Sequence, residues 1–144
     1  PHFLLNFIDY LYWVKQEVHG QKVLKEEPSF KIEDFKFRYW NSVEHHLARR
    51  KAEEKGLTDI VDCLGNLFMI SKNANSRLRD RDVKEKVEMS KKANKGANRQ
   101  IIYEKTKKNN YSWGEDDIKD HYDELRVLLN EKDNLLNLHN ILKY

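Results

Sequence analysis

The segment from His2 to Val18 constrains the fold most, because it is apolar almost all round. It is long enough for about four helical turns, and Gly20 follows it as a stop signal. A helix without a polar face has to be covered by the rest of the chain. Asn6 and Asp9 interrupt the segment, and it is shorter than the roughly 20 apolar residues that span a bilayer. We therefore expect a buried core helix and no membrane association.

The composition is that of one domain with its own core. The chain has 144 residues, of which 39% are hydrophobic and 35% charged, enough apolar material for a single domain. It begins with Pro1 and shows no signal peptide, so we expect a piece cut from a larger protein. The single Cys63 excludes an internal disulfide and a cysteine-based zinc site, and it agrees with a reducing cytoplasm.

The net charge of +3 hides a strong asymmetry along the chain. The segment from Lys72 to Lys108 carries 13 Lys and Arg against 5 Asp and Glu, and the remainder is net acidic. A basic segment beside acidic ones is typical of a surface for phosphate-bearing partners, although such charges also keep a helix soluble. Both interpretations stay open on charge alone.

Two short apolar runs predict strands. Residues 35–43 alternate between aromatic and other side chains and predict a strand that runs toward Val43, and residues 64–70 predict a second one. Residues 47–58, between them, favour a surface helix or loop. After the second run, residues 75–94 lack Gly and Pro and consist of good helix formers, so we expect a basic helix there.

The last part of the chain predicts further helices. Ser112 and Glu115 have the spacing of a capping box, and residues 131–142 predict a final helix. The whole pattern predicts a mostly helical α+β fold in one domain, 1–144. Its parts are a buried N-terminal helix with a connection (1–30), a strand-strand-helix core (31–95) and C-terminal helices (96–144).

Side chains that could carry chemistry gather where the predicted strands end. The first strand ends in Val43-Glu44-His45-His46, the second begins near Gly65-Asn66-Leu67, and Asn75 lies at the head of the basic helix. Mg²⁺ prefers oxygen ligands and keeps several waters, so one carboxylate and one amide suffice when phosphate supplies the rest. A neighbouring imidazole can take a proton from water near pH 7. This is the outline of a metal site that cuts a phosphodiester.

Four stretches with this order and spacing carry a family resemblance: residues 3–10, 35–45, 64–71, and 75–78 with Lys86. Together they resemble the HNH nucleases, and within them the C-terminal nuclease domain (DUF1524) of GmrSD-type, modification-dependent restriction proteins. The resemblance implies a small ββα-metal (HNH-like) motif embedded among helices. It also implies that the chain is a C-terminal part of a protein with a DUF262-like N-terminal domain.

The resemblance assigns roles to individual residues. It implies that Glu44 and Asn75 are the metal ligands and that His45 is the general base. Asn66 also belongs to the catalytic signature, where it would brace the loop between the two active-site elements and not touch the metal. Basic residues would hold DNA phosphates and so position the strand without reading its sequence; these are Lys72, Arg77 and Lys86.

The implied activity is Mg²⁺- or Mn²⁺-dependent hydrolysis of DNA phosphodiesters in a restriction or phage-defence protein of the cytoplasm. Dependence on a nucleotide triphosphate would reside in the DUF262-like domain, so residues 1–144 alone could be inactive. A homo-oligomer is compatible with this reading.

Departures from the family pattern keep alternatives open. Ala48 and Arg49 stand where the family shows Pro-Gln, and His46 could serve as the base if the site were shifted by one residue. Asn73 competes with Asn75 as a ligand. Two other classes of protein also remain: a non-catalytic nucleic-acid-binding or protein-interaction module with the nuclease fold, and a purely helical scaffold, which predicts no strand pair.

Overall fold

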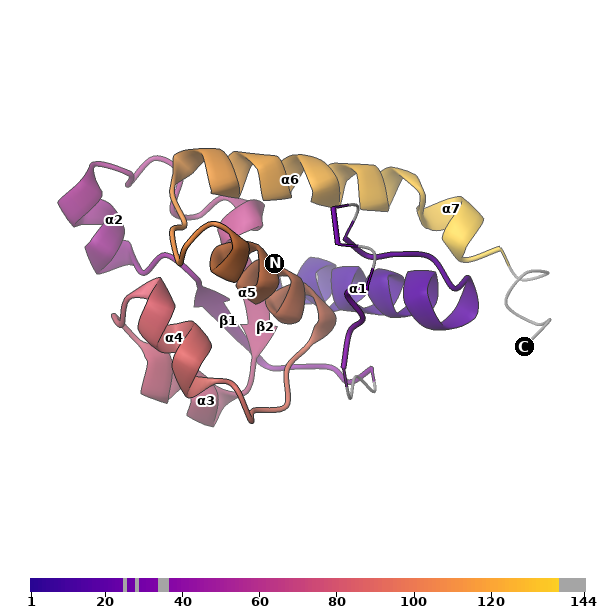
Figure 1. Ribbon diagram of the computed structural model, residues 1–144, viewed down its shortest axis with the longest axis horizontal. Helices are drawn as coiled ribbons and strands as arrows, with labels where there is room; N and C mark the ends of the chain where they lie inside the picture. Colours follow the sequence, from indigo (N-terminus) through magenta and orange to yellow (C-terminus); the bar gives the residue numbers. More distant parts are fainter. Residues whose placement is uncertain (25, 28, 34–36, 138–144) are drawn as a thin grey trace.

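A two-stranded antiparallel sheet lies inside the computed structural model, which describes residues 1–24, 26–27, 29–33 and 37–137 (Figure 1). Strand β1 (Ser42–His45) pairs with β2 (Leu67–Ile70), with Ser42 opposite Ile70 and His45 opposite Leu67. All four residues of β2 are buried, because packed side chains cover both of its faces, and this explains its unbroken apolar run. The strand pair excludes the purely helical scaffold.

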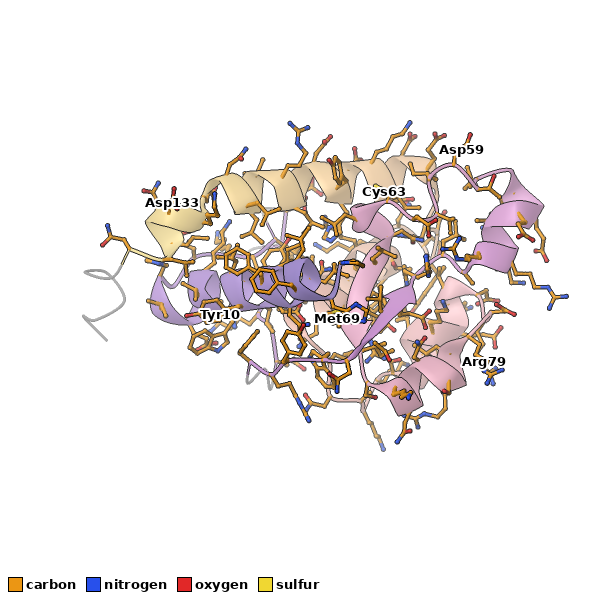
Figure 2. All side chains as sticks on the ribbon, turned by 180° about the vertical axis from the view of Figure 1, so that it is seen from behind. Tyr10, Asp59, Cys63, Met69, Arg79 and Asp133 are labelled. Carbon is orange, nitrogen blue, oxygen red and sulfur yellow. The ribbon has the colours of Figure 1, made fainter. Side chains whose placement is uncertain are left out.

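The two faces of β2 belong to two different core clusters, because successive side chains of a strand point to opposite sides. Leu67 and Met69 join helix α1 (His2–Trp13) in one cluster, and Phe68 and Ile70 join the other. Figure 2 shows Met69 between the sheet and α1. Helices α5 (Ala97–Lys108) and α6 (Glu115–Asn130) contribute to both clusters. The fold is therefore mostly helical α+β, as predicted.

The predicted N-terminal helix is confirmed, but its burial is not uniform. A π-helical segment, η1 (Val14–Val18), continues α1, and Gly20 ends it with a φ of +63°. Phe3 is 75% exposed, whereas the polar Asn6 is buried. The Asn6 side chain accepts from the Trp40 backbone N–H at 2.9 Å and donates to its carbonyl at 3.1 Å. A polar interruption of the apolar run thus holds the segment that leads into β1.

Asp9, the other polar interruption, is a buried carboxyl at the start of α5. Its Oδ1 accepts from the Asn98 backbone N–H at 2.9 Å, and its Oδ2 has no hydrogen-bond partner among the described residues. Gly96 permits this approach, since a Cβ there would lie 2.7 Å from Oδ2. Burial raises the pKa of Asp9 to about 7, against the opposing effect of the hydrogen bond from Asn98.

The shifted pKa of Asp9 predicts a pH-dependent stability. The folded carboxyl holds its proton more tightly than the unfolded one, so this group favours folding at low pH and loses that effect between about pH 4 and pH 7. The loss is about 4 kcal/mol. Asp9→Asn keeps an oxygen for Asn98 but cannot ionise. We expect the stability of the variant relative to the wild type to rise by about that amount over this range, in urea unfolding at several pH values. The control Asp59→Asn changes an exposed carboxylate, and its free energy of unfolding should follow that of the wild type at every pH. The same behaviour in Asp9→Asn would contradict the prediction.

The first predicted strand begins later than expected. Residues 35 and 36 lie outside the described residues, and residues 37–41 have no regular structure. The alternation of aromatics there reflects surface packing, with the rings of Phe37 and Tyr10 5.2 Å apart. The second predicted strand begins with a 3₁₀ turn, η2 (Leu64–Asn66). The surface segment between the strands contains helix α2 (Arg49–Lys55).

The predicted basic helix is two short helices instead of one. Helix α3 (Lys72–Leu78) is capped by Ser71, and α4 (Val83–Met89) is capped by Asp82, whose carboxylate accepts from the Glu85 N–H at 2.9 Å. Arg79, between them, has a φ of +35°, which no helix contains. Asn75 therefore lies inside α3 and not at the head of a long helix.

The C-terminal helices form near their predicted positions. Helix α6 is capped at Gly114 by the Asp117 carboxylate at 2.8 Å, and not by the Ser112–Glu115 pair. Of the predicted final helix, α7 (Lys132–Leu135) lies in the described part, and residues 138–142 lie outside it. No helix among the described residues is long and apolar enough to cross a bilayer.

Candidate active site

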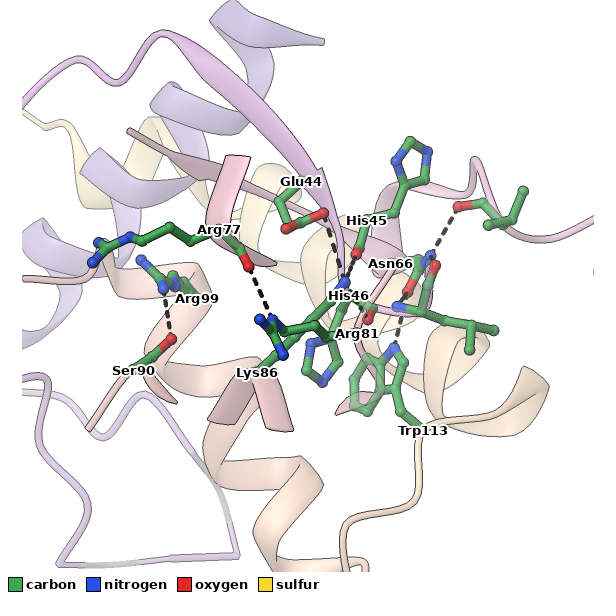
Figure 3. Close-up of polar contacts among 12 residues, drawn as sticks. Glu44, His45, His46, Asn66, Arg77, Arg81, Lys86, Ser90, Arg99 and Trp113 are labelled. Carbon is green, nitrogen blue, oxygen red and sulfur yellow. Dashed lines mark hydrogen bonds and ion pairs between the residues drawn. The ribbon is translucent and has the colours of Figure 1, made fainter. Parts of the chain in front are cut away.

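Glu44 and His45 are the last two residues of β1, and their side chains point to opposite faces of the sheet. Glu44 is opposite Phe68 and His45 opposite Leu67, and these two residues of β2 belong to different core clusters. Figure 3 shows the Glu44 carboxylate turned toward Lys86 while the His45 ring points away from it. The strand thus presents a carboxylate on one side and an imidazole on the other at the same edge of the sheet.

The Glu44 carboxylate is buried with one oxygen engaged and one free. The side chain lies 4% exposed, its Oε1 is 3.6 Å from the Lys86 Nζ, and its Oε2 has no hydrogen-bond partner among the described residues. Burial raises the pKa of Glu44, and the positive charge of Lys86 opposes that rise. A buried carboxylate oxygen without a partner is a position where a cation would be stabilised.

Lys86 is an internal residue, which corrects the prediction that it holds DNA phosphate. It is 0% exposed, and its ammonium donates to the His45 carbonyl at 2.7 Å and the His46 carbonyl at 3.1 Å. Burial lowers the pKa of Lys86, and Glu44 opposes that shift. Lys86 therefore ties α4 to the end of β1 and orients the Glu44 carboxylate.

A second buried cation, Arg99 of α5, lies on the same side of the sheet and was not singled out from the sequence. It donates to the Ser90 hydroxyl at 2.9 Å and the Tyr103 hydroxyl at 3.1 Å, and it lies 5.5 Å from the centre of the Phe68 ring. Burial raises the pKa of Glu44, and the charge of Arg99, like that of Lys86, opposes this rise. The sequence shows Arg99 only as part of a basic stretch, with no pattern that marks it as buried.

The His45 ring is held by a pair of charged residues at the surface. Its Nε2 lies 2.8 Å from Oδ1 of Asp62, and the same oxygen accepts from the Arg49 guanidinium at 2.6 Å. The hydrogen bond with His45 lowers the pKa of Asp62, and Arg49 adds to that effect. The His45 side chain is 23% exposed, so it is open to solvent. Asp62 is a residue that sequence reasoning missed.

His46 is excluded as a base that reaches substrate. It is 0% exposed, its Nε2 lies 2.9 Å from the Thr106 hydroxyl, and its ring packs against Trp113 and Tyr103. Burial lowers the pKa of His46 well below its ordinary value, and the charge of Lys86 adds to this shift. This geometry removes the alternative in which the site is shifted by one residue.

Asn66 fastens the loops around β1 and does not face an open site. Its Oδ1 accepts from the Leu47 N–H at 2.8 Å and the Trp113 indole N–H at 3.1 Å. Its Nδ2 donates to the carbonyls of Leu47 at 3.0 Å and Val61 at 2.9 Å. Gly65 allows this placement, because a Cβ there would lie 2.1 Å from the Ile118 carbonyl of α6. These contacts agree with the bracing role that the family resemblance implies.

Asn75 is half-buried on α3, and α3 packs against β1. The buried Ala74 and Leu78 on either side of it join the same core cluster as Phe68, so α3 covers the face that carries Glu44. The Asn75 side chain forms no hydrogen bond with any of the described residues. Asn73 is exposed at the surface of the same helix.

The donor set fits a hard divalent cation that keeps most of its water. Among the described residues no three His, Cys, Asp or Glu side chains come together in a group that could hold a metal ion. The unpartnered Oε2 of Glu44 belongs to the face of the sheet that is covered by α3, the helix that carries Asn75. Such a ligand-poor set suits Mg²⁺ or Mn²⁺ with phosphate and water completing the coordination.

The other two predicted phosphate contacts lie on the surface. Lys72 and Arg77 are both exposed on α3. Arg77 borders a hollow of about 610 Å³ between α3 and α4, which Arg79 and Arg81 also line. Figure 2 shows Arg79 at the outer edge of the molecule. The basic surface next to β1 is thus made of α3 and the turn that follows it.

The fold and the site define a small strand-strand-helix domain with an acid, a histidine and an amide at the end of the sheet. The family described as GmrSD restriction endonucleases, C-terminal domain, matches residues 3–128. The chain belongs to this family, and the recognition made from the four sequence stretches is confirmed. Searches of curated proteins and of solved structures found no match.

Proposed function

We propose that this chain is a metal-dependent DNA endonuclease of the HNH type, acting in a restriction or phage-defence protein. The observation that carries the proposal is the buried Glu44 with its unpartnered Oε2, directly before the solvent-accessible His45 on β1. Membership in a restriction endonuclease family supports the same conclusion. A DUF262-like N-terminal domain with its nucleotide dependence belongs to the proposal as a further part of the protein.

In this proposal His45 acts as the general base. Its Nε2 is engaged with Asp62, which leaves Nδ1 to accept a proton from the attacking water. Glu44 and Asn75 would hold Mg²⁺ or Mn²⁺, and the cation would supply positive charge to stabilise the phosphate and the leaving oxygen. Lys72 and Arg77, both exposed on α3, would hold neighbouring phosphates and keep the scissile bond in place.

Plasmid cleavage by the purified protein with Mg²⁺ or Mn²⁺ tests this proposal. We expect nicking that EDTA abolishes and that His45→Ala lowers by about 10²- to 10⁴-fold, the usual contribution of a general base. His2→Ala, which changes an exposed histidine on α1, serves as the control and should keep full activity. Circular dichroism should show both variants folded.

The opposite result would favour a binding module. A His45→Ala variant as active as the wild type would remove His45 from the reaction. Should residues 1–144 be inert with every cation, the assay is repeated on the full-length protein with plain and modified DNA. Inactivity there, together with retained DNA binding, would establish the non-catalytic reading.

A further inference from the structure

The surface contact between His45 and Asp62 has the form of a base and its orienting acid. The two side chains meet at 2.8 Å, from Nε2 to Oδ1. A carboxylate can only accept, so Nε2 must carry the proton whenever the ring is neutral. The lone pair then lies on Nδ1, the nitrogen that faces away from Asp62. One ring nitrogen sets the state of the other in this way in many catalytic histidines.

We propose that Asp62 is a positioning residue that fixes the orientation and tautomer of His45, and that Arg49 holds Asp62 in place. This inference rests on the proposed function. Arg49 begins α2, and its guanidinium donates to the same Oδ1 of Asp62 at 2.6 Å. The carboxylate is therefore held from two sides, by one residue of β1 and one of α2.

The backbone around Asp62 is anchored, which distinguishes this contact from an ordinary surface ion pair. Val61, directly before Asp62, is 3% exposed, and its carbonyl accepts from Asn66 at 2.9 Å. The same amide binds the backbone of Leu47, two residues after His45. One buried side chain thus fixes the distance between the two loops, so that Asp62 meets His45 at a set position. An exposed pair on mobile side chains has no such support.

Cleavage kinetics of Asp62→Ala provide the first test. We expect kcat to fall about 10- to 100-fold, the usual effect of losing a group that orients a site residue, while KM for DNA stays within about twofold because a carboxylate is not a group that binds phosphate. Arg49→Ala should give a smaller loss of kcat in the same direction. Asp59→Ala removes an exposed acid from the same loop and should match the wild type. Equal kcat in Asp62→Ala and Asp59→Ala would overturn the proposal.

Nitrogen-15 NMR of the His45 ring separates this inference from the proposed function. At a pH where the ring is neutral, the wild type should show the proton on Nε2, and Asp62→Ala should show a mixture of tautomers. An unchanged tautomer in Asp62→Ala would overturn the positioning role, whatever the cleavage assay shows. If His45→Ala cleaves DNA as well as the wild type, the proposed function fails. The NMR result alone then decides whether Asp62 fixes the tautomer of the His45 ring.

Discussion

Replacing Lys86 with methionine is expected to lower the free energy of unfolding by about 3–5 kcal/mol. The variant leaves the buried Glu44 carboxylate without its cation, and it leaves the carbonyls of His45 and His46 without their donor. Methionine fills similar space but restores none of these contacts. Chemical denaturation of the variant and the wild type at pH 7 measures the difference.

Two further variants make the Lys86 experiment decisive. Lys84→Met changes an exposed lysine of the same helix, whose ammonium lies over the Tyr111 ring, and should cost less than about 1 kcal/mol. Adding Glu44→Gln to Lys86→Met removes the uncompensated charge and should restore part of the loss. If Lys86→Met were as stable as Lys84→Met yet bound DNA less tightly, Lys86 would be a phosphate contact after all.

Asn66→Ala is the second substitution with a large expected effect, about 4 kcal/mol of lost stability. It leaves four buried groups without partners, namely the N–H and carbonyl of Leu47, the Val61 carbonyl and the Trp113 indole N–H. Each such group costs about 1–3 kcal/mol when it is left unpaired, and water that enters the space recovers part of the sum. The thermal midpoint and urea unfolding of the variant report the loss.

Asn75→Ala is the matched control for Asn66→Ala. Asn75 is half-buried and makes no hydrogen bond with its side chain in the described part, so the substitution should cost less than about 1 kcal/mol. It should instead weaken the binding of Mn²⁺ measured by calorimetry. The opposite pattern, with a stable Asn66→Ala that no longer cleaves DNA and a destabilised Asn75→Ala, would exchange the roles of the two asparagines.

The hydrophobic pattern was sufficient to predict burial where a segment is apolar on nearly every side. The buried helix α1 and the fully covered strand β2 followed from such runs, because no arrangement of the chain leaves them in water at low cost. The sequence also predicted the order of the elements correctly, with two strands followed by a helix. The start of β1 was not predicted correctly, because Phe37 and Tyr39 are exposed at the surface and residues 37–41 pair with no strand in the described part of the chain.

Local signals for the break between α3 and α4 were present but overlooked. Ser71 and Asp82 are both good N-cap residues, and each accepts a backbone N–H three residues on. Without Gly or Pro, the stretch between them looks like one helix. A cap inside a run of helix formers is as informative as a helix breaker.

The family, the burial of most of α1 and all of β2, and the residue types at the proposed site were predictable from the chain alone, because apolar runs and closely spaced motif residues carry that information locally. The fold was needed to show that Lys86 is internal, that His46 is enclosed and that Asp62 meets His45. The burial of a charge and the partner of a histidine depend on residues far along the chain. Lys86 follows the His45 and His46 carbonyls by about forty positions, and no local pattern reports such a contact.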